Sequence, residues 1–246
     1  MKKILFASSE VHPLIKTGGL ADVAGSLPRA LAELSQDIRI ILPKYQSIKT
    51  SEEIRFISSV RVNNQDANIL ETKLPGSDVT VWLVDCPALF DKPGNPYVDE
   101  NGNSWDNIAD RFTLFCRIIV EVAMNRAHLD WSADVVHCND WQTGLVPALL
   151  SIEGNKPSTV FTIHNMAYQG MFPESTFAEL NLPKQLWHPN GVEFHEMLSF
   201  IKGGLSYADR ITTVSPTYAL EIQTPEYGYG LEGLLSHKHE VLSGII

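Results

Sequence analysis

A lysine and two glycines, Lys16, Gly18 and Gly19, lie between a strand-like run and a helix-like segment, and Asp22 follows them. Glycines let the backbone turn tightly and bring N–H groups close to a ligand. A helix N-terminus favours anions, and Lys16 adds a positive charge. The segment therefore indicates a phosphate or diphosphate site. The alternative is that the glycines only make a strand-to-helix turn and that Lys16 is solvated.

The segment KTGGLADV matches neither of the common nucleotide motifs. It lacks the GxxxxGK[ST] pattern of a phosphate-binding loop, and one GG pair does not supply the three spaced glycines of a dinucleotide fingerprint. No acidic residue is properly placed after a second strand. A nicotinamide-dependent oxidoreductase, which the fold class alone would allow, is therefore strongly disfavoured.

A second group of residues has the chemistry of a carbohydrate site. Asp140 and Trp141 follow one strand-like run, and His164 and Asn165 follow the next. A carboxylate accepts hydrogen bonds from hydroxyls, an indole stacks on sugar faces, and a histidine can bond a hydroxyl or shield a developing charge. The alternatives are a helix N-cap at Asp140 beside a core tryptophan, and a histidine satisfied by backbone in a turn.

The elements that position these residues follow an alternating pattern. Helix-period segments separate most of a series of short apolar, β-branched runs, which predicts a parallel sheet with helices on both faces, an α/β Rossmann-like fold. The runs are Ile4–Ser8, Ile38–Leu42, Val79–Val84, Val135–Cys138, Thr159–Ile163 and Ile211–Val214. The helical segments include Leu20–Leu34, Ile108–Arg126, Gly144–Glu153 and Phe194–Tyr207.

Three segments depart from this alternation. Glu53–Asp85 is strand-rich with polar turns, which predicts a β-meander at one edge of the sheet. Asp91–Asp106, which contains Tyr97, is rich in Gly, Pro and Asn and predicts a long functional loop near the strand ends. The final VLSGII is strand-like, which fits either a docked C-terminal strand or a truncated chain.

Ligands of open α/β sheets bind beyond the carboxyl ends of the strands. The residues that directly follow the predicted strands are therefore expected to form one site at one sheet edge. Ser215 and Pro216 also follow a strand but read as a helix start, and no serine or cysteine nucleophile motif is present.

Composition narrows the function classes. The chain has 246 residues, 44% of them hydrophobic, and a net charge of −10 with no basic run, which argues against nucleic acid and anionic membranes as partners. Three cysteines fit a reducing, cytoplasmic compartment, and no stretch approaches the ~20 apolar residues of a membrane span. His12, His188 and His195 lack metal-ligand spacing, so neither a metal nor a cofactor is expected.

Four stretches together resemble one enzyme family, the bacterial glycogen synthases and plant starch synthases, which are retaining GT-B glycosyltransferases of family 5. The stretches are ILFASSEVHPLIKTGGLADVAGSLPRAL, HCNDWQTGLVPALL, FTIHNMAYQG and ADRITTVSPTYALEIQTPEYGYGLEGLL. They span nearly the whole chain. The resemblance implies that residues 1–246 are the N-terminal, acceptor-side Rossmann-like half of a GT-B enzyme, whose C-terminal donor-binding domain is absent from this chain.

The resemblance also implies roles for individual residues. Lys16 resembles the family's donor-binding lysine, with Gly18 and Gly19 approaching the glucosyl diphosphate and Asp22 supporting donor binding. His164 resembles the residue that contacts the transferred glucose. The remaining residues with an implied place near donor or acceptor are Asp140, which with His164 would stabilise the reacting sugar, and Tyr97, Trp141 and Asn165.

The function that the resemblance implies is transfer of glucose from ADP-glucose to an α-1,4-glucan with retention, and the sequence leaves ADP- versus UDP-glucose open. Without an enzyme nucleophile, retention favours front-face attack, with the leaving diphosphate helping to deprotonate the acceptor. The chain alone is expected to be inactive, because half of the donor site is missing. A non-catalytic glucan-binding module is the alternative.

Overall fold

The computed structural model describes all residues from Met1 to Ile246. The chain divides into two compact units, unit 1 (Met1–Val136) and unit 2 (His137–Ile246). Both units combine strands with helices, as the alternating sequence pattern predicts, and the α/β Rossmann-like fold class is confirmed. None of the helices combines the length and the apolar character that crossing a membrane requires.

The strands of unit 1 form a mixed sheet. Strands β1 (Lys3–Ala7), β2 (Asp37–Pro43) and β5 (Thr80–Asp85) pair in parallel in the order β1-β2-β5. Strands β4 (Gln65–Lys73) and β3 (Arg55–Val62) then extend the sheet with antiparallel pairing, and β3 is the edge strand. The predicted β-meander at a sheet edge is confirmed. The central strands are apolar without alternation because both of their faces are covered.

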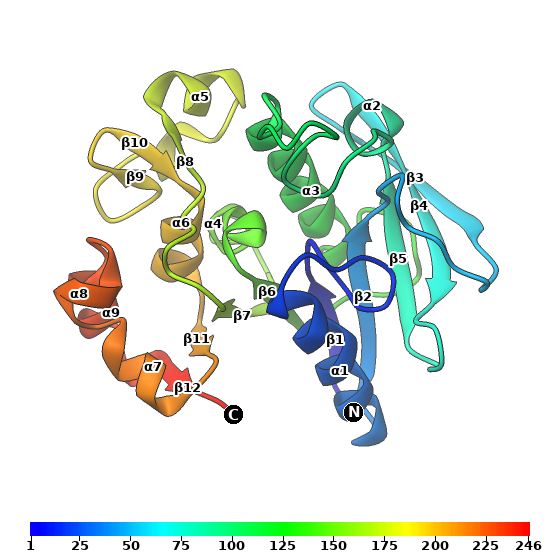
Figure 1. Cartoon of the computed structure of the whole chain (residues 1–246), viewed down its shortest axis with the longest axis horizontal. Helices are drawn as coiled ribbons and strands as arrows, with labels where there is room; N and C mark the ends of the chain where they lie inside the picture. The colour runs from blue at the N-terminus through cyan, green and yellow to red at the C-terminus, as the bar shows by residue number, and fades with distance from the viewer. The chain divides into compact units, whose positions relative to one another are not determined.

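Three helices accompany this sheet. Helix α1 (Gly19–Glu33) packs against β2 (Figure 1) and buries Leu20 and Ala24. Pro28 lies inside α1, where it removes one backbone N–H from the helix. Helices α2 (Pro87–Phe90) and α3 (Ile108–Ala123) follow the meander, and most residues of α3 are buried.

Unit 2 has a parallel arrangement of its own. Strand β7 (Ser158–Ile163) pairs in parallel with β11 (Arg210–Thr213), which pairs in parallel with β12 (Leu242–Gly244). Strand β6 (Val135–Asn139), which contains the boundary between the units, lies next to β7. The strand-like character of the final VLSGII segment is confirmed, because it contains β12, which pairs with β11.

One predicted helix begins later than its sequence pattern indicates. The segment Phe194–Tyr207 is helical only from Phe200, as α6 (Phe200–Tyr207). Its first residues form β9 (Glu193–Phe194) and β10 (Met197–Ser199), which pair with β8 (Met171–Pro173) in a small antiparallel sheet. The Ser199 hydroxyl accepts a hydrogen bond from the Lys202 N–H at 3.3 Å and caps α6.

The other helices of unit 2 are short. Helix α7 begins after Ser215, whose hydroxyl accepts a hydrogen bond from the Tyr218 N–H at 2.9 Å, so the predicted helix start is confirmed. Helix α4 covers only part of the predicted Gly144–Glu153 segment. The α-helices are α4 (Leu145–Leu150), α5 (Glu174–Glu179), α7 (Pro216–Glu221), α8 (Pro225–Gly228) and α9 (Glu232–His237), and the 3-10 helices are η1 (Trp141–Thr143), η2 (Lys184–Leu186) and η3 (His239–Val241).

Helices α4 and α6 pack closely because glycines stand at their contacts. A Cβ at Gly144 would lie 2.1 Å from the Phe200 carbonyl oxygen, and a Cβ at Gly203 would lie 2.9 Å from the Gly144 carbonyl oxygen. Only glycine permits this approach of the backbones. The contact holds the residues after β6 against the start of α6 and thereby positions Trp141.

Candidate functional site

Lys16 and Asp22 form an exposed ion pair at the N-terminus of α1. The Lys16 Nζ atom lies 2.7 and 2.8 Å from the two carboxylate oxygens of Asp22. The side chains are 48% and 54% exposed. An exposed pair of this kind contributes only about 0–1 kcal/mol. Lys16 can therefore exchange Asp22 for a ligand phosphate at small cost, while Asp22 holds the ammonium group in place beforehand.

Gly18 and Gly19 leave open space in front of α1. The Gly18 backbone is extended (φ −147°, ψ −166°), a conformation that any residue adopts. A Cβ at either glycine would meet no atom within 4 Å. The turn at Gly18 does not itself require glycine, so the interpretation in which the glycines only make a turn is weakened. No side chain caps α1, so its first N–H groups and its dipole remain to favour an anion.

A buried carboxylate, Glu10, anchors the segment that carries Lys16. Glu10 is 2% exposed and follows β1. It accepts hydrogen bonds from the Thr17 N–H, from the Thr17 hydroxyl at 2.6 Å and from the Gly18 N–H at 3.2 Å. Buried carboxylates need partners of this number and strength. Sequence reasoning did not include Glu10 in the site, although an acidic residue so soon after a buried strand is a usable signal.

Tyr97 joins the same cluster from the long loop. Its hydroxyl donates to Glu10 and lies 3.0 Å from the Ser9 hydroxyl oxygen. Burial, followed by the negative charge of Glu10, raises the pKa of Tyr97 well above its usual value, so the phenol stays a neutral donor. The segment 91–106 contains no helix or strand, as predicted, and Glu10 ties it to the segment of Lys16.

A buried arginine, Arg111 of α3, supports the segment 91–106. Arg111 is 1% exposed, donates to the Leu89 and Pro96 carbonyl oxygens, and lies 4.7 Å from the centroid of the Trp105 ring. Burial lowers the pKa of this guanidinium. Because Pro96 precedes Tyr97, Arg111 helps to hold the phenol where it meets Glu10. No sequence pattern singled out Arg111.

In unit 2, Asp140 and His164 are linked at the ends of β6 and β7. The Asp140 carboxylate accepts a hydrogen bond from the His164 backbone N–H at 2.7 Å. Asp140 stands at the N-cap position of η1, as the alternative interpretation expects, but its side chain does not cap the helix. Its backbone has a φ of 58°, which is a strained conformation for a residue other than glycine. The strained φ of Asp140 and the hydrogen bond from the His164 N–H together fix the backbone from which the Asp140 and His164 side chains project.

The ring of His164 has a defined orientation. Its Nε2 atom lies 3.1 Å from Oδ1 of Asn139, whose Nδ2 donates to the His137 carbonyl oxygen at 3.4 Å. Because Oδ1 only accepts, the ring carries its proton on Nε2 and leaves Nδ1 as an acceptor. Burial lowers the pKa of His164 to about 4, so the ring is neutral near pH 7. The His164 backbone N–H bonds the Asp140 carboxylate, and the His164 ring bonds the Asn139 side chain. The histidine is therefore not satisfied by backbone groups of a turn, which was the alternative interpretation.

These histidines predict a loss of stability in mild acid. Burial, followed by the charge of His164, lowers the pKa of His137 from an ordinary value of 6.5 to about 4. Because the unfolded chain binds these protons first, the stabilisation is full above pH 6.5 and is lost as the pH falls toward 4. Each histidine accounts for up to about 3 kcal/mol of this loss by pH 4 and for about 2 kcal/mol of it by pH 5. Urea unfolding at pH 7.5 and pH 5 measures the loss over that interval.

The matched variants for this prediction are His164→Gln and His137→Asn, each of which removes one titrating ring. Each is expected to flatten the pH dependence of the free energy of unfolding, whatever its effect at pH 7.5. An equally steep pH dependence in the double variant would show that other groups cause it.

Trp141 and Asn165 differ in exposure. Trp141 is 8% exposed, and its ring centroid lies 6.2 Å from that of Phe172 and 5.9 Å from that of Phe200. The indole is thus a core side chain, as the alternative interpretation expects. Asn165 is exposed, and its side-chain oxygen accepts from the Ala167 N–H at 2.9 Å. Acceptor roles for both residues stay predictions.

The predicted residues therefore form two groups. Unit 1 brings one group around Glu10, and unit 2 brings the other to the ends of β6 and β7. The first group is Lys16, Gly18, Gly19, Asp22 and Tyr97, and the second is Asp140, Trp141, His164 and Asn165. That both groups serve one site stays a prediction. No group of three or more His, Cys, Asp or Glu side chains is arranged to hold a metal ion.

Comparisons with known proteins all point to the same enzyme family. Residues 3–237 match the family model described as "Starch synthase catalytic domain". The chain is 55% identical over 248 residues to a glycogen synthase of Thioalkalivibrio sulfidiphilus, covering 99% of this chain and 51% of that protein. It is 55% identical to glycogen synthase 1 of Methylococcus capsulatus, covering 99% and 50%. The chain thus spans about half the length of the curated relatives it matches.

A solved structure extends the similarity to three dimensions. The catalytic domain of starch synthase IV from Arabidopsis thaliana, bound to ADP and acarbose, matches with a TM-score of 0.85 and 25% identity. The match covers all of this chain and 51% of that one.

Proposed function

We propose, from the premise that this chain belongs to the starch synthase catalytic domain family, that its full-length protein is a glycosyltransferase acting in glycogen synthesis. The reaction is transfer of glucose from ADP-glucose to the non-reducing end of an α-1,4-glucan, with retention. The match along nearly the whole chain to glycogen synthases at 55% identity carries this proposal. Residues 1–246 form the N-terminal, acceptor-side domain, and a C-terminal domain supplies the rest of the donor site.

Unit 1 contributes the donor-binding groups. Lys16 and the first N–H groups of α1 place positive charge beside open space at Gly18 and Gly19. This arrangement suits the diphosphate of ADP-glucose, whose negative charge grows as the glycosidic bond breaks. Asp22 holds Lys16 before the donor binds, and Glu10 fixes the backbone of Thr17 and Gly18.

Unit 2 contributes groups for the transferred sugar. His164 is neutral, with Nδ1 free to accept a hydrogen bond from a hydroxyl, and Asp140 holds a carboxylate next to it. A carboxylate nearby favours positive charge on an oxocarbenium-like sugar. Attack of the acceptor hydroxyl on the same face, with its proton passing to the leaving diphosphate, gives retention without an enzyme nucleophile. The proposed compartment is the cytoplasm.

The proposal is tested by incorporation of glucose from ADP-glucose into maltoheptaose. The full-length protein is expected to elongate the oligosaccharide, and the 246-residue chain is expected to show no measurable turnover, because half of the donor site is missing. The control is the same assay with UDP-glucose, which distinguishes the two donors. Absence of transfer by the full-length protein with either donor would overturn the proposal, and turnover by the isolated chain would overturn its domain assignment.

A glucan-binding module is the second candidate function. The observation that favours it is that the chain spans only about half of its catalytic relatives. Binding of maltooligosaccharide with no transfer by the full-length protein would select this function.

A further inference from the structure

A buried asparagine, Asn139, contacts the ring of His164 but has no part in the transfer described so far. Asn139 is the last residue of β6 and is 0% exposed. Its Oδ1 atom lies 3.1 Å from Nε2 of His164, and the Thr143 hydroxyl donates to its backbone carbonyl oxygen at 2.9 Å. Burial of an amide is costly unless its polar atoms are hydrogen-bonded, so the contact with His164 matters to both side chains.

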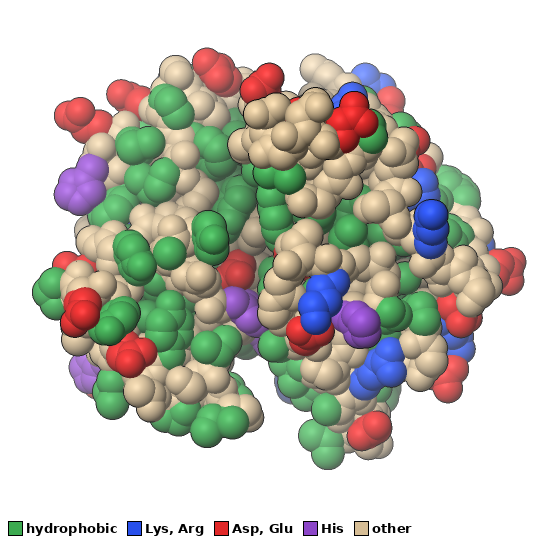
Figure 2. Space-filling model, in the orientation of Figure 1, with side chains coloured by type: hydrophobic (Ala, Val, Ile, Leu, Met, Phe, Trp, Pro, Cys, Tyr) green, Lys and Arg blue, Asp and Glu red, His purple; other side chains and the backbone are tan.

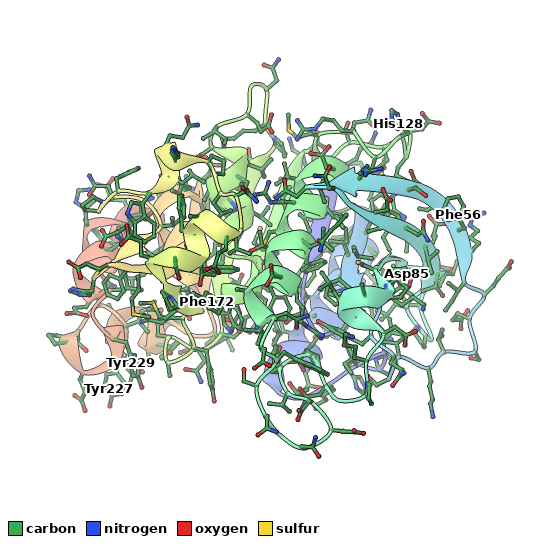
Figure 3. All side chains as sticks on the ribbon, turned by 90° about the horizontal axis from the view of Figure 1, so that it is seen from above. Phe56, Asp85, His128, Phe172, Tyr227 and Tyr229 are labelled. Carbon is green, nitrogen blue, oxygen red and sulfur yellow. The ribbon has the colours of Figure 1, made fainter.

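The end of β6 is anchored in the core of unit 2. Trp141, two residues after Asn139, has its ring centroid 6.2 Å from that of Phe172. In Figure 3, Phe172 lies inside unit 2, whereas Tyr227 and Tyr229 lie at its outer edge. The backbone that carries Asn139 is therefore held next to a packed aromatic cluster, and the asparagine reaches His164 from a fixed position.

The amide of Asn139 has a defined orientation. Its Nδ2 atom donates to the His137 carbonyl oxygen at 3.4 Å, which leaves Oδ1 toward the imidazole of His164. The opposite orientation would place Oδ1 against that carbonyl oxygen, and two acceptors repel each other. Asn139 thus presents an acceptor, and not a donor, to the ring.

The backbone of the segment that carries His164 is fixed at two points. The Asp140 carboxylate accepts from the His164 N–H at 2.7 Å, and the Tyr218 hydroxyl accepts from the Met166 N–H at 3.1 Å. These contacts do not decide which ring nitrogen carries the proton. The contact with Oδ1 does, because a ring turned by 180° would place a C–H group there and lose the hydrogen bond.

We propose that Asn139 is a positioning residue of the transfer: by accepting from Nε2 of His164, it keeps the ring proton there and leaves Nδ1 to accept from a sugar hydroxyl. This inference rests on the proposed function, in which His164 contacts the transferred glucose. Asn139 acts through His164 and does not itself touch the sugar. Without its Oδ1 atom the proton is shared between the two nitrogens, and a ring with the proton on Nδ1 no longer accepts.

The first test is the tautomer itself. NMR spectra of the 246-residue chain with isotope-labelled histidine rings distinguish protonated from unprotonated ring nitrogens at pH 7.5. The His164→Gln variant identifies the signals of His164 by their loss. A single neutral tautomer with the proton on Nε2 is expected, and Asn139→Leu is expected to give signals averaged between two tautomers. A proton on Nδ1 in the wild-type chain, or an unchanged His164 spectrum in Asn139→Leu, would overturn the assignment.

The second test is the pH profile of Asn139→Asp in the full-length protein. Aspartate keeps the shape and the acceptor, but a carboxylate in contact brings the pKa of His164 from about 4 back toward its ordinary 6.5. A charged ring donates from both nitrogens. The kcat of this variant is therefore expected to be about tenfold lower at pH 5.5 than at pH 7.5, because about one ring in ten is then neutral. The wild-type ring stays neutral over this interval.

The comparison of pH profiles isolates residue 139. The titratable groups around His164 are Asp140 and His137 of β6 and its end, and Tyr218 of α7, and they are the same in both proteins. The acidic and histidine side chains that Figure 2 shows over the elements of unit 2 are also unchanged. The matched control is Asn155→Asp, which adds the same charge at an exposed position and is expected to keep the wild-type profile.

Failure of this assignment is distinguishable from failure of the proposed function. Transfer by the full-length protein with the same pH profile in Asn139→Asp and Asn155→Asp removes the positioning role alone. Absence of transfer with either donor removes the proposed function, and the ring spectra of the 246-residue chain then still decide whether Asn139 selects the tautomer. Those spectra need no variant at position 139 for the wild-type tautomer, so a variant that does not fold leaves this test in place.

Discussion

Replacing Lys16 by alanine in the full-length protein is expected to lower kcat/KM for ADP-glucose by about 100- to 1,000-fold. Removal of one donor that stabilises a developing oxyanion costs about 2.7–4 kcal/mol, which is a rate factor of this size. The expected loss falls on both kcat and donor affinity, because the diphosphate is charged in the ground state and gains charge in the transition state. Steady-state kinetics with ADP-glucose as the varied substrate measure both.

The fold should not change in this variant. The ion pair between Lys16 and Asp22 is exposed, so its loss alters the free energy of unfolding by about 1 kcal/mol or less. The matched control is Lys49→Ala, which removes another exposed lysine. Kinetics of the Lys16 variant that equal those of the Lys49 variant would refute the donor-binding role.

Replacing Glu10 by alanine is expected to have the largest effect on stability. The Thr17 N–H, the Gly18 N–H and the Tyr97 hydroxyl all lose their acceptor. An unsatisfied donor costs about 1–3 kcal/mol when it is buried. Because Thr17 and Gly18 are exposed to water and the Tyr97 hydroxyl keeps the Ser9 hydroxyl as a partner, a smaller decrease of about 2–3 kcal/mol in the free energy of unfolding is expected. Urea unfolding of the 246-residue chain, followed by circular dichroism and tryptophan fluorescence, measures this decrease.

Two further variants separate the contacts of Glu10. Tyr97→Phe removes one hydrogen bond and is expected to cost about 1 kcal/mol. Glu33→Ala removes a carboxylate at the end of α1, away from this cluster, and is expected to be neutral. If Glu10→Ala unfolds at the same urea concentration as Glu33→Ala, the carboxylate does not anchor the turn.

The fold class followed from the sequence because it depends on local pattern. Continuous β-branched runs such as those of β2 and β5 are stable only where both faces are covered, and the segments between them repeat with the period of a helix. The strand-rich runs separated by polar turns between 53 and 85 equally indicated a β-meander. These patterns are read within ten or so residues, so no tertiary information was needed.

The start of α6 was predicted wrongly because it depends on a contact between segments that are distant in the sequence. The segment Phe194–Ser199 has an apolar pattern that fits either a helix or a short strand. Pairing with Met171–Pro173 decides between the two, and that partner is distant in the sequence. A local sequence pattern does not show which distant strand will pair with the segment.

A sequence pattern equally could not show the hydrogen bonds of Glu10 or the protonation and tautomer of His164. Glu10 bonds Tyr97 across 87 positions, and the His164 ring bonds Asn139 across 25. A carboxylate or an imidazole in a sequence has no fixed partner, exposure or tautomer until the chain has folded. Its place after a strand indicates only that it lies at the edge where ligands bind.

The sequence by itself determined the α/β class, the family resemblance and the identity of the charged and glycine residues at the start of α1, because each rests on residue types at short spacing. Only the tertiary structure decided that Glu10 anchors that segment, that the His164 ring is buried and bonded to Asn139, and that the Trp141 ring is buried. Burial and hydrogen-bond partners both depend on residues that folding brings together from distant positions of the chain.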